Sequence, residues 1–202
     1  MRYYQKMKLV IISGTPGTGK TSVSNKISEL IDIKVITLNE LAISEGLIHD
    51  IDQKRDTNII DVDNLVSYVM KKIKELKQRG IKLIIIESHF SDIVPNNLIN
   101  YAFVLRCEPS VLRKRLEKRG YSKEKIVENL QAEILGNCAN FLIKKEMERP
   151  LLEIDTTSLD VEGVSSIILD IIQNNANMEK FHVGKVDWLE KLFQENQLDE
   201  YF

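Results

Sequence analysis

Short runs of Val, Ile and Leu alternate along the chain with longer segments in which apolar residues recur at helical spacing. Five such runs are predicted strands: KLVIIS (8–13), IKVITL (33–38), KLIIIE (82–87), YAFVLR (101–106) and LLEID (151–155). Because strands this apolar are typical of a parallel sheet covered on both faces by helices, the pattern predicts an α/β fold, a three-layer sandwich.

The segments between these runs predict helices over 20–31, 39–46, 61–79, 110–118, 122–148 and 160–174. Asp61, Ser122 and Asp160 stand at three predicted helix starts, where a side-chain oxygen can accept a hydrogen bond from a free backbone N–H. Residues 47–60 (LIHDIDQKRDTNII) are polar and charged, so we expect an irregular connection outside the core.

Composition narrows the class of protein. A chain of 202 residues that is 43% hydrophobic can bury one core. No run approaches about 18 apolar residues, which argues against a membrane span. Cys107 and Cys138 are far apart in sequence, so we expect both to pack as small hydrophobic residues in a reducing, cytoplasmic setting.

Charge gives a second limit. The formal net charge of −2, from 28 basic and 30 acidic residues, gives no direct signature of nucleic-acid binding. Residues 106–125, however, carry eight basic side chains against three acidic ones, which indicates an anionic ligand there.

The first predicted strand runs directly into GTPGTGKT (14–21), which matches G-x-x-x-x-G-K-[ST] at every fixed position and is followed by a predicted helix. Lys20 is expected to reach the β and γ phosphates of a nucleotide, and the Thr21 hydroxyl to ligate Mg²⁺. Three glycines let the backbone curl so that its N–H groups point toward a phosphate: Gly14, Gly17 and Gly19.

The strand KLIIIE ends on Glu87, and His89 follows two positions later. In P-loop enzymes a second strand commonly ends in a carboxylate that holds Mg²⁺, which makes Glu87 the candidate. If the chain stays extended, His89 lies on the same side as Glu87 and could orient an attacking water or an acceptor. The alternatives are a solvated Glu87 and a structural, hydrogen-bonded His89.

The segment RKRLEKRGYSKEK (113–125) is a candidate lid. Arg115 and Arg119 are four positions apart and share one helix face, while Gly120 and Tyr121 interrupt the helix. Phosphoryl transfer needs positive charge and exclusion of water, and a helix, hinge and helix bearing arginines provides both. An ordinary solvated basic face is the alternative.

Three stretches together give the chain a resemblance to the archaeal members of the adenylate kinase isoenzyme six family, also called Fap-seven, over about residues 8–174. They are GTPGTGKT, ESHFSDIVP and VLRCEPSVLRKRLEKRGYSKEKIVENLQAEI. The resemblance implies a P-loop nucleoside monophosphate (NMP) kinase fold with a five-stranded parallel sheet within residues 1–177. It also implies an NMP-binding segment at about 37–60 and a short lid at about 118–128.

The resemblance further implies ATP with Mg²⁺, adenylate kinase and ATPase activity, and a role in small-ribosomal-subunit maturation through a platform ribosomal protein. The expected ATP contacts are Gly14, Gly17, Thr18, Gly19, Lys20, Thr21, Ser22 and Arg119. The expected catalytic residues are Lys20, Glu87, His89, Arg115 and Arg119, and the expected metal ligands are Thr21 and Glu87.

Two positions depart from the family pattern. Glu87 stands where the family commonly has Asp, which moves the carboxylate by about a bond length. Ile43 stands where ordinary adenylate kinases carry an arginine that grips the AMP phosphate. Either Arg55 or Arg106 could substitute for that arginine.

Residues 178–202 form a C-terminal tail with the single tryptophan, Trp188, and apolar residues at helical spacing: Val186, Leu189, Leu192 and Phe193. The tail either packs on its own domain, which we prefer, or binds a partner.

The sequence thus favours a phosphotransferase that moves the ATP γ-phosphate to AMP or another NMP, and the resemblance implies that it also has ATPase activity and acts in small-ribosomal-subunit maturation. The alternative is an ATP-hydrolysing assembly switch that binds a ribosomal protein and has little NMP kinase activity. Shikimate kinase or dephospho-coenzyme-A kinase would share the P-loop but not the other two stretches.

Overall fold

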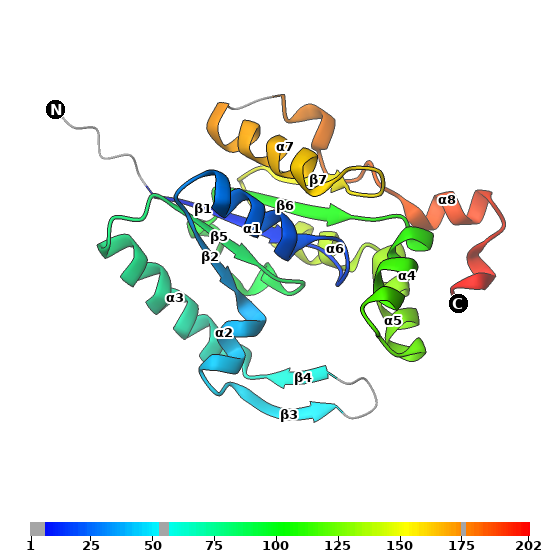
Figure 1. Cartoon of the computed structure of the whole chain (residues 1–202), viewed down its shortest axis with the longest axis horizontal. Coiled ribbons are helices and arrows are strands. Elements are labelled where there is room, and N and C mark those ends of the chain that lie inside the picture. Colours follow the sequence, from blue (N-terminus) through cyan, green and yellow to red (C-terminus); the bar gives the residue numbers. More distant parts are fainter. Residues whose placement is uncertain (1–6, 53–56, 175–176) are drawn as a thin grey trace.

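The computed structural model describes residues 7–52, 57–174 and 177–202. Its central sheet has five strands in the order β2-β5-β1-β6-β7, with every neighbouring pair parallel (Figure 1). The strands are β1 Lys8–Ser13, β2 Lys34–Thr37, β5 Leu83–Glu87, β6 Tyr101–Arg106 and β7 Leu151–Asp155. The predicted α/β class and five-stranded parallel sheet are confirmed, and each predicted strand is within one residue of its observed bounds.

Helices cover both faces of the sheet and complete three layers (Figure 1). One face packs against α1 (Lys20–Leu30) and α7 (Val161–Asn174). The other packs against α2 (Leu38–Ser44), α3 (Val62–Gln78) and α6 (Asn137–Ile143). The remaining pair, α4 (Pro109–Lys118) and α5 (Lys123–Ile134), follows the carboxyl end of β6.

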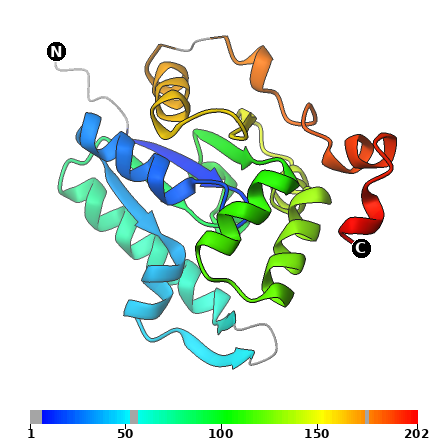
Figure 2. The same ribbon diagram turned by 45° about the vertical axis from the view of Figure 1, so that its right-hand side comes forward.

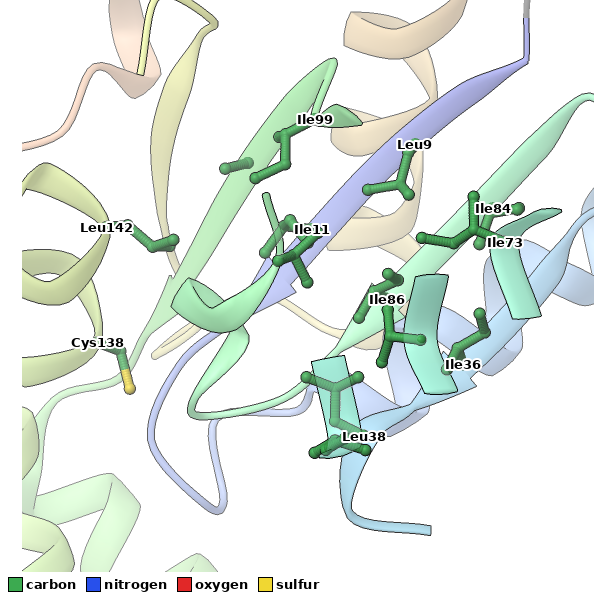
Figure 3. Close-up of a cluster of buried hydrophobic side chains, with 14 of the residues drawn as sticks. Leu9, Ile11, Ile36, Leu38, Ile73, Ile84, Ile86, Ile99, Cys138 and Leu142 are labelled. Atoms are coloured by element: carbon green, nitrogen blue, oxygen red, sulfur yellow. The ribbon is translucent and has the colours of Figure 1, made fainter. Parts of the chain in front are cut away.

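Most strand positions are apolar because successive side chains pack into the cores on the two faces of the sheet. In β1, Val10 and Ile12 belong to the cluster beneath α1 and α7, whereas Leu9 and Ile11 belong to the opposite cluster. Figure 3 shows Leu9 and Ile11 beside Ile86 of β5 in that second cluster. This alternation follows from the two-residue period of a strand and explains why the strands of the sheet could be predicted from the sequence.

The expectation of an irregular connection over 47–60 was wrong. The segment contains an antiparallel pair, β3 (Ile48–Asp52) and β4 (Thr57–Ile60), which stands apart from the central sheet (Figure 1). Backbone pairing between the two strands, rather than burial of an apolar face, defines them, so Ile51 and Ile59 remain exposed. A segment without an amphipathic pattern gives little sequence signal for such a pair.

The single helix predicted over 122–148 was also wrong, because the chain breaks at Gly136. Gly136 has φ +64°, and its N–H donates to the carbonyl of Glu133 at 3.1 Å, which closes α5 before α6 begins. The predicted caps are confirmed: Asp61, Ser122 and Asp160 accept hydrogen bonds from the backbone N–H of Asn64 (3.1 Å), Lys125 (3.2 Å) and Gly163 (2.8 Å).

The C-terminal tail ends beside α4 and α5 (Figures 1 and 2). Its helix α8 (Trp188–Gln194) buries Trp188 and Leu192 in a third apolar cluster, which Tyr201 and residues of α4 and α5 complete. Leu189 and Phe193 face solvent with 41% and 65% exposure, so the predicted apolar stripe is divided between two faces of α8. In the described ranges no helix is both long enough and apolar enough to cross a membrane.

Candidate functional site

The loop between β1 and α1 requires glycine at two positions. Gly14 has φ +142°, and a Cβ there would lie 2.4 Å from the carbonyl oxygen of Leu105. Gly17 has φ +94°, and a Cβ there would lie 2.7 Å from Cδ1 of Leu112. The loop is therefore packed tightly against β6 and α4, and its shape tolerates no side chain at either position.

Lys20 and Thr21 open α1 and point toward the end of β5. Lys20 Nζ donates a hydrogen bond to the carbonyl of Thr15 at 3.1 Å. Burial lowers the pKa of Lys20 below its ordinary value, although the charge of Glu87 opposes this effect. A nucleotide phosphate in the loop would give this ammonium group a full charge partner.

Glu87, 2% exposed, is held by threonine hydroxyls. Thr21 Oγ1 lies 2.9 and 3.1 Å from its two carboxylate oxygens, and Thr37 Oγ1 donates to Oε1 at 3.0 Å. One carboxylate and hydroxyl oxygens at the rim of a phosphate-binding loop fit Mg²⁺, which is usually held by one or two carboxylates together with phosphates and water. The donor set therefore fits the metal expected from the sequence.

Thr37 was missed by sequence reasoning. It ends β2 directly opposite Glu87 in the parallel pairing of β2 with β5. A polar residue at the carboxyl end of an apolar strand was the available signal, but only the strand order identifies Glu87 as its neighbour.

His89 lies in the turn after β5 and lines the same cavity as Lys20, Thr21 and Glu87. Surrounding protein atoms and the charge of Lys20 lower the pKa of its imidazole from 6.5 to about 4. The ring is therefore neutral near neutral pH. It can donate one hydrogen bond and accept another, with a water or an acceptor substrate as partner, but it supplies no positive charge.

Two cavities flank the phosphate-binding loop. The larger, about 700 Å³, brings together seven of the predicted residues and extends between the β3–β4 pair and α5–α6. The second, about 640 Å³, lies toward α7. Gly17, Gly19 and Arg119 line both cavities. The larger cavity is also lined by Lys20, Thr21, Glu87 and His89, and the second by Thr18, Ser22 and Arg115.

The structure thus separates Arg115 from the Glu87 side of the loop. Arg115 donates to the hydroxyl of Thr156 at 3.2 Å and to its carbonyl at 2.8 Å. Arg119, at the end of α4, lines both cavities, so its side chain could contact a nucleotide that extends from one cavity into the other. Gly14 lines neither cavity and acts through the fold of the loop.

The far wall of the larger cavity combines neutral side chains with three charged ones, Glu40, Lys125 and Glu128. Arg106 is not available there: it is 3% exposed and bonds to Glu133 and Glu153. Arg55, the other candidate for an acceptor phosphate, lies outside the described residues. The wall includes four amides and an aromatic ring: Asn39, Asn58, Asn129, Asn137 and Phe141.

Glu133 was also missed by sequence reasoning. It is 1% exposed on the buried face of α5, three positions after Leu130, and it accepts a hydrogen bond from the Thr15 hydroxyl at 2.5 Å. A carboxylate within an apolar helical stripe was the available signal.

Comparison with known proteins places the chain in a family. The family described as AAA domain matches residues 10–136. The protein named "Putative adenylate kinase" from Methanocaldococcus jannaschii is 37% identical over 184 residues, which cover 91% of this chain and 94% of that protein. The protein of the same name from Archaeoglobus fulgidus is 36% identical over 194 residues, which cover 96% and 97%.

Solved structures agree on the fold. A deoxyadenosine kinase from M. mycoides superposes with a TM-score of 0.51 at 21% identity, covering 82% of this chain and 99% of that one. A sugar kinase from Janibacter sp. gives a TM-score of 0.58 at 14% identity, covering 82% and 94%. The chain therefore belongs to the AAA domain family, and to the same family as the two proteins named "Putative adenylate kinase".

Proposed function

We propose that this protein transfers the γ-phosphoryl group of ATP to a nucleoside monophosphate, with AMP as the preferred acceptor. The observation that carries the proposal is the meeting of Lys20 with the hydrogen-bonded Thr21 and Glu87 at the floor of a cavity of about 700 Å³. That cavity continues past the loop to the amide-lined wall, which leaves room for an acceptor beside the donor phosphates. The names of the relatives support adenylate kinase chemistry.

The residues have distinct roles in this proposal. Backbone N–H groups of the loop bind the donor phosphates, and Lys20 neutralises their charge. Thr21 and Glu87 would hold Mg²⁺, which when bound offsets the negative charge on the phosphates. Arg119, in the lid of about residues 118–128, contacts the donor ATP. The segment of about 37–60 covers the acceptor NMP. His89, being neutral, orients the acceptor or a water.

One observation favours a second candidate, an ATP-hydrolysing switch. In the described ranges Arg119 is the one arginine that lines the larger cavity, so the acceptor wall offers no arginine fork for a monophosphate. A neutral His89 beside the transferring group could instead orient water. The Fap-seven resemblance also supports this candidate. It implies ATPase activity, a small-subunit ribosomal protein as partner and a part in ribosome maturation, and we propose a cytoplasmic location.

A chromatographic count of nucleotides separates the two candidates. Purified protein is incubated with Mg²⁺ and ATP, with and without AMP, beside the Lys20→Ala variant as control. We expect AMP and ATP to disappear one for one as ADP accumulates without free phosphate. Persistence of AMP while ATP becomes ADP and phosphate would favour the switch, and normal turnover by Lys20→Ala would contradict both.

A further inference from the structure

A buried group of polar side chains that the proposed chemistry does not use connects α5 to the tail. Its members, the anchor cluster, are Arg106, Glu133, Glu153 and Trp188. Arg106 lies between the two glutamates, donating through Nε to Glu133 Oε1 at 2.8 Å and through Nη1 to Glu153 Oε1. All four residues are less than 8% exposed, so these contacts are made away from water.

Two carboxylates of the anchor cluster hold the tail. Glu153 Oε2 accepts hydrogen bonds from the backbone N–H groups of Gly184 at 2.9 Å and Val186 at 3.4 Å. Glu133 Oε1 accepts the indole N–H of Trp188 at 3.2 Å. The tail is therefore fixed by directed hydrogen bonds to buried acceptors as well as by apolar packing.

The other oxygen of Glu133 reaches the phosphate-binding loop. Glu133 Oε2 accepts the Thr15 hydroxyl at 2.5 Å, and Thr15 is itself 2% exposed. The carbonyl of Thr15 accepts from the N–H of Thr18 at 3.2 Å, from its hydroxyl at 2.9 Å, and from Lys20 Nζ at 3.1 Å. The Thr15 carbonyl thus binds two later residues of the loop, Thr18 and Lys20, and Glu133 holds the Thr15 side chain.

Four donors converge on the carboxylate of Glu133. The guanidinium of Arg106, the backbone N–H of Cys107 and the Trp188 indole donate to Oε1, and the Thr15 hydroxyl donates to Oε2. One side chain thus joins β6, the tail and the phosphate-binding loop. The position therefore couples its neighbours: loss of one donor frees Glu133 to shift away from the others.

We propose that the C-terminal tail positions the phosphate-binding loop through the chain Trp188–Glu133–Thr15 and so raises the affinity for the donor nucleotide. Glu133 and Trp188 are positioning residues, since neither lines the two cavities beside the loop. A loop held in its binding shape does not have to be ordered when the nucleotide arrives. This inference rests on the proposed function only in requiring that the loop binds ATP or ADP.

The test compares Thr15→Val, which removes the hydroxyl, with Thr15→Ser, which keeps it. We expect Thr15→Val to raise the Kd of ADP, measured by calorimetry, and the KM of ATP by roughly three- to tenfold while kcat changes less than about twofold. Thr15 itself lines the larger cavity, so the comparison is relative: Thr15→Ser should give a lower Kd than Thr15→Val. Trp188→Phe should shift Kd in the same direction, whereas Leu189→Ala, on the exposed face of the same helix, should not.

Trp188 also supplies a direct readout, because it is the chain's single tryptophan. In the nucleotide-free protein its fluorescence should differ between the wild type and Thr15→Val, because loss of the hydroxyl frees Glu133, and should change less in Thr15→Ser. If Thr15→Val has the fluorescence of the wild type, or binds ADP as the wild type does, the inference is overturned and the proposed function stands.

Two further outcomes are decisive. A wild type that binds neither ATP nor ADP overturns the proposed function and this inference with it. If Thr15→Val does not fold, the comparison of Trp188→Phe with Leu189→Ala decides, and equal Kd values for these two variants overturn the inference.

Discussion

The imidazole of His89 lines the larger cavity beside Lys20 and Glu87, and its protonation can be measured alone. We predict that NMR titration of the nucleotide-free protein places its pKa at about 4 rather than 6.5, because burial and the charge of Lys20 both disfavour the imidazolium. The folded state thus prefers the neutral ring. Its contribution to stability is complete above pH 6.5 and is lost as the pH falls toward about 4.

A His89→Asn variant assigns the resonance by its disappearance. A midpoint near 6.5 in the wild type would mean that the ring is solvated, and its neutral role in either candidate function would then have no support.

Thr37 gives a second prediction for a single residue. Its hydroxyl is one of two that orient the Glu87 carboxylate, so Thr37→Val should leave that carboxylate less well positioned for Mg²⁺. We expect the Mg²⁺ concentration for half-maximal ATP turnover to rise by roughly tenfold, the lower end for loss of a metal ligand's hydrogen-bond partner. Thr37→Ser, which keeps the hydroxyl, is the control, and equal Mg²⁺ dependence in both variants would contradict the role.

These residues show where sequence reasoning about the site stops. Lys20, Thr21 and Glu87 could be predicted because a loop between a strand and a helix, and the end of a neighbouring strand, fix their places. Thr37 depends on which strand pairs with β5, and the contact of Thr15 with Glu133 joins residues 118 positions apart. Neither pairing is encoded in local spacing.

Among the elements, the break between α5 and α6 depends on one glycine, Gly136. Gly136 has φ +64°, a region that costs a non-glycine residue about 1 kcal/mol. A Cβ there would lie 3.8 Å from its nearest neighbours, the side-chain nitrogens of Arg106 and Asn140, so backbone strain, not crowding, should set the cost. We predict that Gly136→Ala lowers the free energy of unfolding by about 1 kcal/mol.

Denaturant unfolding followed by circular dichroism measures that change. Gly136→Asn is the matched variant, because asparagine enters the left-handed region more readily than alanine and should lose less stability. Equal losses in the two variants would assign the break to packing around α6 instead.

The elements that could be predicted are those that follow a burial period. Each sheet strand lies in a largely apolar run and was located within one residue, and three helix starts carry side-chain caps. The β3–β4 pair and the end of α5 depend on backbone pairing and on one left-handed residue, and neither changes the apolar period from which elements are predicted.

At the scale of the whole molecule, the described residues form three apolar clusters, two on the faces of the sheet and one between α4, α5 and the tail. The first two follow from alternation within the strands. The third needs Trp188, Leu192 and Tyr201 from the end of the chain, and no local pattern shows that they meet α4 and α5. The stability of α4 and α5 therefore depends on a segment that follows the last strand of the sheet.

This dependence leads to a prediction for the chain shortened after Val186. Removing residues 187–202 takes away three buried side chains, each of which contributes about 1.5–3 kcal/mol when fully buried, and exposes their partners on α4 and α5. The sheet clusters lose none of these contacts. Hydrogen exchange followed by mass spectrometry should therefore show faster exchange over 109–134, with β1, β5 and β6 still protected. Equal loss of protection in the sheet would mean that the three clusters unfold as one unit, and unchanged exchange in α4 and α5 would mean that those helices are stable without the tail.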